Sequence, residues 1–321
     1  MRTLPPERRE LIEALVAETA PGGITAGLLE KDEHLTDALR ALFSLRLRWV
    51  QLVLCGGTSL AKGYGLIERM SEDADLKVAI RDAQQSPRAK IRRRLSGLKT
   101  QVAGTLSGIG LVEDKSRRQA FNENRYFRSE WSYARHYESV AGLRPHLQIE
   151  LTARAPVLPT QVCRITTLAD RLAGRDDRAF DAPVVAVAET VAEKALSFLR
   201  RYAQHRAGLM RQAWDTALVR HVYDVHRIHR RRPEAVAAAR QAFPALVAGD
   251  QQEFGSQFPD FAGAPRKVLT GALWQVRSDG KIQQEFTSNL LPLIYGADTP
   301  AFAEAFADFN AVAEALLDTL P

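Results

Sequence analysis

The pattern of apolar and polar residues in the amino-terminal half of the chain predicts several helices and a group of strands. Apolar residues recur every three or four positions over residues 6–19, 24–45 and 86–105, which is the spacing of one face of a helix. Pro5 and Pro6 stand where the first of these helices would begin. We expect the first two helices to pack as scaffold beside a sheet.

Five short segments of the same half carry strand patterns. Residues 50–55 form a short apolar run, which predicts a buried strand, and residues 73–78 alternate polar and apolar side chains. Three more strands are expected over residues 122–127, 131–137 and 146–152. Aromatic residues crowd the first two of these three. Aromatic side chains on strands usually pack in a core or across strands, and a platform for stacking bases is the rarer alternative.

Beyond these strands the pattern becomes helical. The polar stretch 174–183 contains Gly and Pro, which predicts a loop and a domain junction that separates residues 1–175 from 176–321. Helices are expected over 184–203 and 210–229, and three or four more follow them. Three phenylalanines at helical spacing predict core packing near the end of the chain: Phe302, Phe306 and Phe309.

The turn after the first predicted strand suits a bound anion. Gly56 and Gly57 end the apolar run, and such a pair lets the backbone turn tightly and approach a ligand closely. Thr58 or Ser59 can cap the short helix that follows. The amides at the start of that helix would then point at an anion such as a phosphate.

The next predicted strand suits a bound metal ion. Asp73 and Asp75 lie two positions apart, so their side chains share one strand face. Two carboxylates so placed repel each other unless a cation neutralises them, and hard oxygen ligands of this kind favour Mg²⁺ or Mn²⁺. The Gly-Gly turn and the pair of aspartates are each a weak signal alone. Together they are what nucleotidyl transfer needs, because the turn holds a triphosphate while metal ions align the attacking hydroxyl with the departing pyrophosphate.

The combined string GGTSLAKGYGLIERMSEDADLKV resembles the first motif of the nucleotidyltransferase β superfamily and, more narrowly, the AbiEii/AbiGii toxin family. The resemblance covers about residues 30–230. It implies a mixed α/β nucleotidyltransferase-like core with a helical carboxy-terminal domain, and Mg²⁺-dependent transfer of a nucleoside monophosphate from an NTP. Members of the superfamily take a third carboxylate from a neighbouring strand, and Glu150 fits that position, with Gln148 on the same strand face.

Two helical motifs extend the resemblance. Lys194, followed by Arg200 or Arg201, matches a family motif in which the lysine would neutralise phosphate charge. The neighbouring glutamates also fit an ordinary surface helix, so the residues alone leave both interpretations open. The string RHVYD matches the final family motif and places Asp224 there. Asp224 would either hold Lys194 by an ion pair or support the incoming nucleotide.

The resemblance implies a nucleotide-binding set that extends beyond the turn. Lys62 and Arg69 would act as additional cations, and the role of Ser71, two residues before the first aspartate, stays open. The full set is Gly56, Gly57, Thr58, Ser59, Lys62, Arg69 and Ser71.

The composition describes a globular protein. Of 321 residues, 45% are hydrophobic and 26% are charged, which is enough to build a core. No run of about 18 apolar residues occurs, so no membrane span is expected. The start of the chain lacks the apolar core of a signal peptide. With only Cys55 and Cys163 present, we expect a reducing compartment, the cytoplasm.

The formal net charge of +6 suits a polyanionic partner without requiring one. Arg88, Arg92 and Arg93 make one predicted helix basic, and Arg230 and Arg231 lie at the end of another. Such clusters are often a solvated face or a helix terminus that complements the dipole, yet they also suit an RNA backbone. With the resemblance, they favour an RNA acceptor, the 3′ end of tRNA, and a cognate antitoxin as partner.

Two other functions remain open. The first is the same chemistry with a protein hydroxyl as the acceptor. The second is a module that binds a nucleotide or RNA without turnover, which the complete carboxylate set disfavours.

Overall fold

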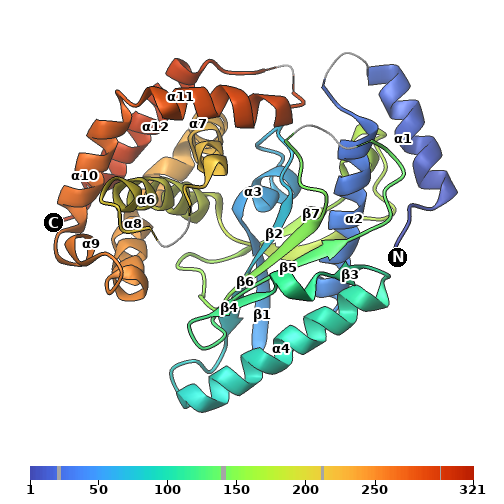
Figure 1. The fold of residues 1–321 in the computed structure, drawn as a ribbon, viewed down its shortest axis with the longest axis horizontal. Helices are drawn as coiled ribbons and strands as arrows, with labels where there is room; N and C mark the ends of the chain where they lie inside the picture. The colour runs from blue at the N-terminus through green and yellow to red at the C-terminus, as the bar shows by residue number, and fades with distance from the viewer. Residues whose placement is uncertain (20–22, 139–141, 211–212, 297) are drawn as a thin grey trace. The chain divides into compact units, whose positions relative to one another are not determined.

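The chain divides into two compact units (Figure 1). The computed structural model describes residues 1–19, 23–138, 142–210, 213–296 and 298–321. Unit 1 comprises Met1–Pro156 and Thr160–Val185, and unit 2 comprises Val157–Pro159 and Ala186–Pro321. The chain thus leaves unit 1 after Val185, ten residues beyond the junction that we expected. The reason is that a strand, β8 (Phe180–Val184), lies in the predicted loop and pairs with the sheet of unit 1.

Unit 1 is built on a mixed sheet. Its strand order is β3-β5-β6-β2-β1-β8-β7, with β4 paired to β5. The bounds are β1 Val50–Cys55, β2 Asp73–Ile80, β3 Val112–Glu113, β4 Gln119–Phe121, β5 Tyr126–Ser132, β6 Leu147–Thr152, β7 Gln161–Ile165 and β8 Phe180–Val184. Strand β2 runs antiparallel to β1 and parallel to β6, so it lies in the middle of the sheet between these two strands.

Helices α2 (Ala26–Phe43) and α4 (Arg88–Gly108) cover one face of this sheet. The other helices of unit 1 are α1 Pro6–Thr19, α3 Gly56–Thr58 and α5 Leu168–Leu172, and a π-helical turn, Ser59–Gly63, follows α3. Alternate residues of β2, including Leu76 and Val78, face the apolar core with Leu39 of α2 and Leu95 of α4. The opposite residues of β2, Asp73 among them, therefore lie on the other face of the sheet.

Helix α2 buries five successive polar residues, Glu30 to His34. Such burial is tolerated because buried charges are paired or hydrogen-bonded. The ion pairs are Lys31 with Glu72, Asp32 with Lys62, and Glu33 with Arg8. They tie α2 to α1, to the turn after α3 and to the start of β2, and so orient the segments around the candidate site.

Two predicted strands were wrong in their bounds. Asn122, Glu123 and Asn124 have φ angles of 50°, 55° and 70°, so they form a turn where we expected a strand. A single strand, β5, replaces the two. The aromatic residues nevertheless pack as expected, since Phe127 and Trp131 are buried in the core.

Unit 2 is helical. Its α-helices are α6 Val187–Arg206, α7 Arg220–Arg231, α8 Pro233–Phe254, α9 Pro259–Gly263, α10 Pro265–Val276, α11 Gly280–Glu285 and α12 Phe302–Leu317. The helix expected over 210–229 begins only at Arg220, after a 3₁₀ turn at Thr216–Val219, and residues 211 and 212 lie outside the described part of the chain. The predicted aromatic core is confirmed in part. Phe309 is fully buried, with its ring centroid 5.1 Å from that of Phe198, whereas Phe302 and Phe306 are half-buried.

These observations confirm the expected fold class, a mixed-sheet α/β core with a helical carboxy-terminal unit. None of the helices in the described ranges is long and apolar enough to cross a membrane.

Candidate active site

The Gly-Gly turn lies directly against the acidic strand. Gly56 has φ 69°, a conformation that L side chains rarely adopt, and a Cβ there would overlap Oδ2 of Asp75. A Cβ on Gly57 would lie 2.8 Å from both Nη2 of Arg69 and Oγ of Ser71. Gly56 is therefore required for this close approach, and the side chains of Arg69 and Ser71 lie beside Gly57.

Contrary to our expectation, the hydroxyl groups of Thr58 and Ser59 do not cap the short helix. Helix α3 begins at Gly56, so Thr58 and Ser59 lie too late in the chain to cap it. Instead the Thr58 hydroxyl donates to the main-chain oxygen of Asp73 and lies 2.8 Å from the Ser71 hydroxyl. The Ser59 hydroxyl donates to the main-chain oxygen of Gly56, at 2.8 Å. Thr58 thus fastens the turn to the first residue of β2.

The three predicted carboxylates lie on one face of adjacent strands. Asp75 is the register partner of Glu150, and Asp73 that of Gln148. Glu150 is half-buried, and burial together with the nearby Asp73 charge raises the pKa of its carboxyl. The Tyr126 hydroxyl hydrogen-bonds to Glu150, and burial and this carboxylate raise the pKa of Tyr126.

The donor chemistry of this cluster fits a divalent metal ion. Asp73, Asp75 and Glu150 supply hard oxygen ligands. Burial, and after it the Asp73 charge, raises the pKa of Glu150, and a nearby cation would favour its ionised form. Within the described ranges no three His, Cys, Asp or Glu side chains are grouped so that they could hold a metal ion, so these carboxylates do not form a preassembled metal site. The carboxylates also bond to polar side chains of this face.

The most prominent of these side chains belongs to Arg144, which the sequence analysis missed. Its Nη1 lies 2.7 Å from Asp73 Oδ1 and 3.2 Å from Gln148 Oε1. Gln148 in turn donates from Nε2 to Glu150 Oε1, at 2.7 Å. The only sequence signal for Arg144 was an arginine followed by proline just before a predicted strand, which is too common a pattern to single it out.

Lys62, predicted to bind the triphosphate, contacts two side chains of α2. Its Nζ lies 2.6 Å from Asp32 Oδ1 and 2.6 Å from the Thr36 hydroxyl, and the residue is buried. The structure thus pairs Lys62 with α2, and its predicted contact with a triphosphate stays a prediction. Its distance from α2 in the sequence concealed this pairing.

Lys194 and Asp224 form a buried ion pair within unit 2. The distance from Lys194 Nζ to Asp224 Oδ2 is 2.6 Å, and their side chains are 7% and 0% exposed. His221, one turn before the pair, lies with Nδ1 3.2 Å from the main-chain oxygen of Lys194. Of the two roles considered for Asp224, holding Lys194 by an ion pair is the one that the structure contains.

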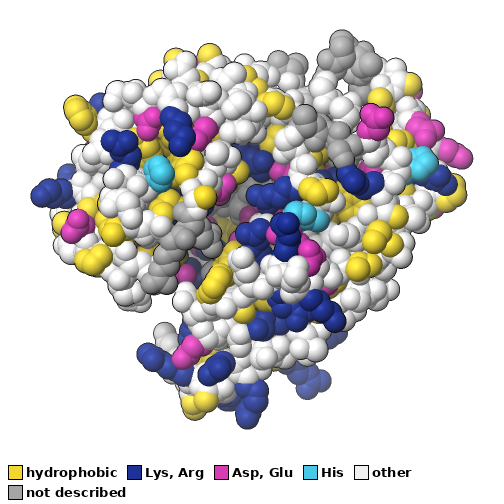
Figure 2. Space-filling view, viewed as in Figure 1, with side chains coloured by type: hydrophobic (Ala, Val, Ile, Leu, Met, Phe, Trp, Pro, Cys, Tyr) yellow, Lys and Arg dark blue, Asp and Glu magenta, His cyan; other side chains and the backbone are white. Residues whose placement is uncertain are grey.

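The basic residues predicted to bind RNA differ in their exposure and in whether acidic neighbours neutralise their charge. Arg88, Arg92 and Arg93 are exposed on α4, and Figure 2 shows Lys and Arg side chains gathered where α4 lies in Figure 1. Arg231 is also exposed. Arg230 lies 2.5 Å from Asp308 and 3.4 Å from Glu304, so acidic neighbours neutralise its charge.

Comparisons with known proteins identify the family and a similar fold. The family described as "Nucleotidyl transferase AbiEii toxin, Type IV TA system" matches residues 37–308. A search of curated proteins found no match. Among solved structures, MenT4, a nucleotidyltransferase toxin from Mycobacterium tuberculosis H37Rv, is similar with a TM-score of 0.56 and 18% identity, over 98% of this chain and 90% of that one. At this identity the likeness concerns the fold. The family match spans most of the sequence, and the chain therefore belongs to the AbiEii family of nucleotidyltransferase toxins of type IV toxin–antitoxin systems.

Proposed function

We propose that this nucleotidyltransferase toxin transfers a nucleoside monophosphate from an NTP to RNA, at the 3′ end of tRNA, and depends on Mg²⁺ or Mn²⁺. The observation that carries the proposal is the position of Asp73, Asp75 and Glu150 on one sheet face beside the Gly56 turn. Its family also implies an antitoxin as partner. NTP and tRNA as substrates place the proposed reaction in the cytoplasm.

The proposed step is a substitution at phosphorus. The acceptor hydroxyl oxygen forms a bond to the α-phosphorus, the bond from that phosphorus to the β-phosphate oxygen breaks, and pyrophosphate leaves. Glu150 is our candidate base for the hydroxyl proton. Bound at Asp73, Asp75 and Glu150, the metal ions would align hydroxyl and phosphate and neutralise the charge on pyrophosphate.

The other residues bind and orient. Gly57, Thr58 and Ser59 form the turn against which the triphosphate lies, with Arg69 and Ser71 packed beside it. We assign Lys194 to neutralising phosphate charge, with Asp224 holding its ammonium group in place. A long, flexible lysine needs such a partner because an unconstrained side chain would lose entropy on binding.

The RNA acceptor is supported by the exposed cations of α4. Arg88, Arg92 and Arg93 are exposed, and the apolar side of the helix packs on the core through residues such as Ile91 and Leu95. A helix in this arrangement presents its charge to the solvent, where phosphates of an RNA backbone can bind.

The test is transfer of label from each α-³²P NTP to deacylated tRNA by the purified protein. We expect labelled tRNA with at least one NTP, and loss of labelling in Asp73→Asn and Asp75→Asn. Asp176→Asn provides a control, since Asp176 is exposed and pairs with Arg164 away from the cluster. Unlabelled tRNA with all four NTPs would contradict the acceptor.

The same assay in a cell lysate separates the alternatives. Label on protein would identify a protein hydroxyl as acceptor. If the wild type labels nothing and the two asparagine variants still inhibit growth, the protein acts by binding.

A further inference from the structure

Arg144 combines a buried main-chain anchor with a side chain that lies on the proposed metal site. Its main-chain N–H donates to Glu72 Oε2 at 2.6 Å, and its main-chain oxygen accepts from Lys31 Nζ at 2.8 Å. Lys31 and Glu72 are themselves paired at 2.7 Å, with side chains 2% and 0% exposed. The anchor therefore holds the main chain of Arg144 whatever its side chain does.

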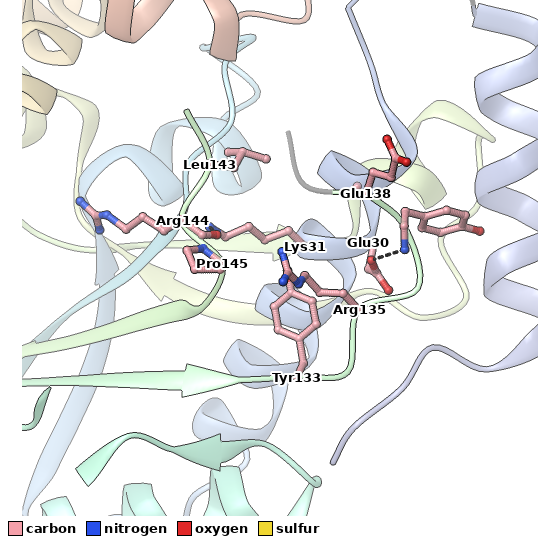
Figure 3. Close-up of a pocket in the computed structure, with 10 residues that line it drawn as sticks. Glu30, Lys31, Tyr133, Arg135, Glu138, Leu143, Arg144 and Pro145 are labelled. Carbon is pink, nitrogen blue, oxygen red and sulfur yellow. Dashed lines mark hydrogen bonds between the residues drawn. The ribbon is translucent and has the colours of Figure 1, made fainter. Parts of the chain in front are cut away.

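The side chain leaves this anchor in the direction of the carboxylates. Figure 3 shows Arg144 beside a pocket lined by Lys31 and Tyr133, with its guanidinium pointing away from both of them. The guanidinium bonds to Asp73 Oδ1 at 2.7 Å and is 33% exposed. A side chain with this exposure can turn to a new partner, whereas its main chain stays fixed.

We propose that Arg144 binds the triphosphate and couples metal binding to NTP binding, an inference that rests on the proposed function of the carboxylate cluster. A divalent cation at Asp73 repels a guanidinium that bonds to the same carboxylate, so metal binding weakens the contact between Arg144 and Asp73. A triphosphate offers the displaced guanidinium an anionic partner with the geometry for paired hydrogen bonds.

This exchange links the two ligands. Metal binding alone leaves Arg144 without its carboxylate contact, whereas metal and NTP together supply the phosphate as a new contact. NTP therefore strengthens metal binding, and by thermodynamic reciprocity metal strengthens NTP binding by the same factor. Arg144 makes the cluster bind metal weakly until the substrate is present.

The experiment measures Mn²⁺ binding to the full chain by titration calorimetry, without nucleotide and with each of the four α,β-methylene NTP analogues. Arg144→Met keeps the apolar stem and the main-chain anchor. Arg164→Met is the matched control, because it removes an arginine that pairs with Asp176 at 2.9 Å elsewhere in unit 1. Thermal unfolding establishes that each variant is folded.

We expect Arg144→Met to bind Mn²⁺ about fivefold more tightly than wild type without nucleotide, and to lose most of the strengthening that the analogue confers. Its affinity for the analogue falls about tenfold, and Arg144→Lys recovers part of that loss. Arg164→Met behaves as wild type. In an Asp73→Asn background, Arg144→Met no longer changes the affinity for Mn²⁺.

Two outcomes overturn the inference, and they are distinguishable. If wild type binds Mn²⁺ more tightly than Asp73→Asn does, but Arg144→Met matches wild type with and without analogue, the coupling role is wrong and the metal site stands. If wild type binds Mn²⁺ no better than Asp73→Asn, the metal site itself fails and the role of Arg144 fails with it.

Discussion

Gly56 combines a left-handed backbone conformation with a close approach to the acidic strand. Its φ of 69° and its proximity to Asp75 Oδ2 leave no room for a side chain. The Gly-Gly pair predicted a tight turn from sequence alone, because few other residues adopt positive φ at low cost. That the close neighbour is an aspartate of the next strand depended on the register of β1 with β2, in which Cys55 pairs with Asp75.

We predict that Gly56→Ala both destabilises the protein and abolishes transfer. A left-handed alanine costs at least about 1 kcal/mol, and its Cβ would also displace the Asp75 carboxylate. Urea unfolding and the labelling assay measure the two effects. Gly104→Ala is the control: apart from its chain neighbours and the backbone of its own helix, no atom lies within 4 Å of its added Cβ, and alanine in a helix should stabilise by about 0.5–1 kcal/mol. A fully active Gly56→Ala would exclude the proposed role of the turn.

His34 has an environment that resists protonation. It is fully buried on α2, both its ring nitrogens lack hydrogen-bond partners among the described residues, and its ring lies 4.2 Å from that of Tyr133. Burial, with a smaller contribution from the nearby Arg2 charge, lowers the pKa of His34 to about 3. The imidazole is therefore neutral in the folded protein at neutral pH.

We predict that His34 makes the fold sensitive to acid. Its folded-state pKa lies below the unfolded value of about 6.5, so the unfolded chain takes up the proton first as pH falls. Between about pH 6.5 and 3 this lowers the free energy of unfolding by up to about 1.4 kcal/mol per pH unit, and above pH 6.5 it has no effect. His34→Phe should flatten this part of the profile in urea unfolding. His136→Phe, at an exposed position, should leave it unchanged.

At the scale of elements, α6 and α7 are joined by the pair of Lys194 and Asp224. The helical spacing and the family motifs identified both residues from the sequence, and either role of Asp224 agreed with the pattern. Only packing of the two helices brought Nζ within 2.6 Å of Oδ2 in a buried position. Glu189 on α6 shows the same dependence on packing. The residues alone left a surface helix open, yet Glu189 is buried and accepts the N–H groups of Val157 and Leu158.

We predict that Lys194→Met lowers the free energy of unfolding by about 3–5 kcal/mol, because it removes the cationic partner of a buried carboxylate. Adding Asp224→Asn should recover much of this stability without restoring transfer, since the phosphate-binding cation is still absent. Arg201→Met breaks a partly exposed pair with Asp215 and should cost less than about 1 kcal/mol. Transfer by the double variant at the wild-type rate would show that the pair is only structural.

The strands show where the hydrophobic pattern of the sequence predicted the strand bounds correctly and where it did not. Strands β1, β2 and β6 were predicted within one or two residues, because each combines a clear apolar pattern with an abrupt end. The segment before β5 was misjudged, since the positive φ angles of Asn122 to Asn124 reflect a local turn that aromatic neighbours concealed. Strand β8 was missed because its proline suggested a loop, although β8 pairs with both β1 and β7.

At the scale of the whole molecule, the structure shows which of the excess positive charges are exposed to solvent. The net charge of +6 established only that a polyanion is a plausible partner. The structure distinguishes the exposed arginines of α4 from Arg230, whose charge Asp308 neutralises.

We predict that changing Arg88, Arg92 and Arg93 together to alanine weakens tRNA binding without changing stability. The slope of log K against log salt concentration should fall in magnitude by about two to three, since each phosphate contact contributes about 0.7–0.9. Filter binding across a salt series measures this slope. Arg230→Ala should leave it nearly unchanged. An unaltered slope in the triple variant would exclude α4 as the RNA-binding surface.

The sequence by itself determined much of the local structure around the candidate site, namely the glycine turn and the alternating acidic strand. These features follow from side-chain identity and spacing, which do not depend on distant parts of the chain. The third carboxylate and the two helical motifs were expected from the resemblance to the family. Only the tertiary structure decided which charges meet, as when Lys62 pairs with Asp32 and Arg144 with Asp73. The first pair joins residues 30 positions apart in the sequence, and the second joins residues 71 positions apart. Such pairs depend on strand register and helix packing, because these determine which of many possible partners comes within reach.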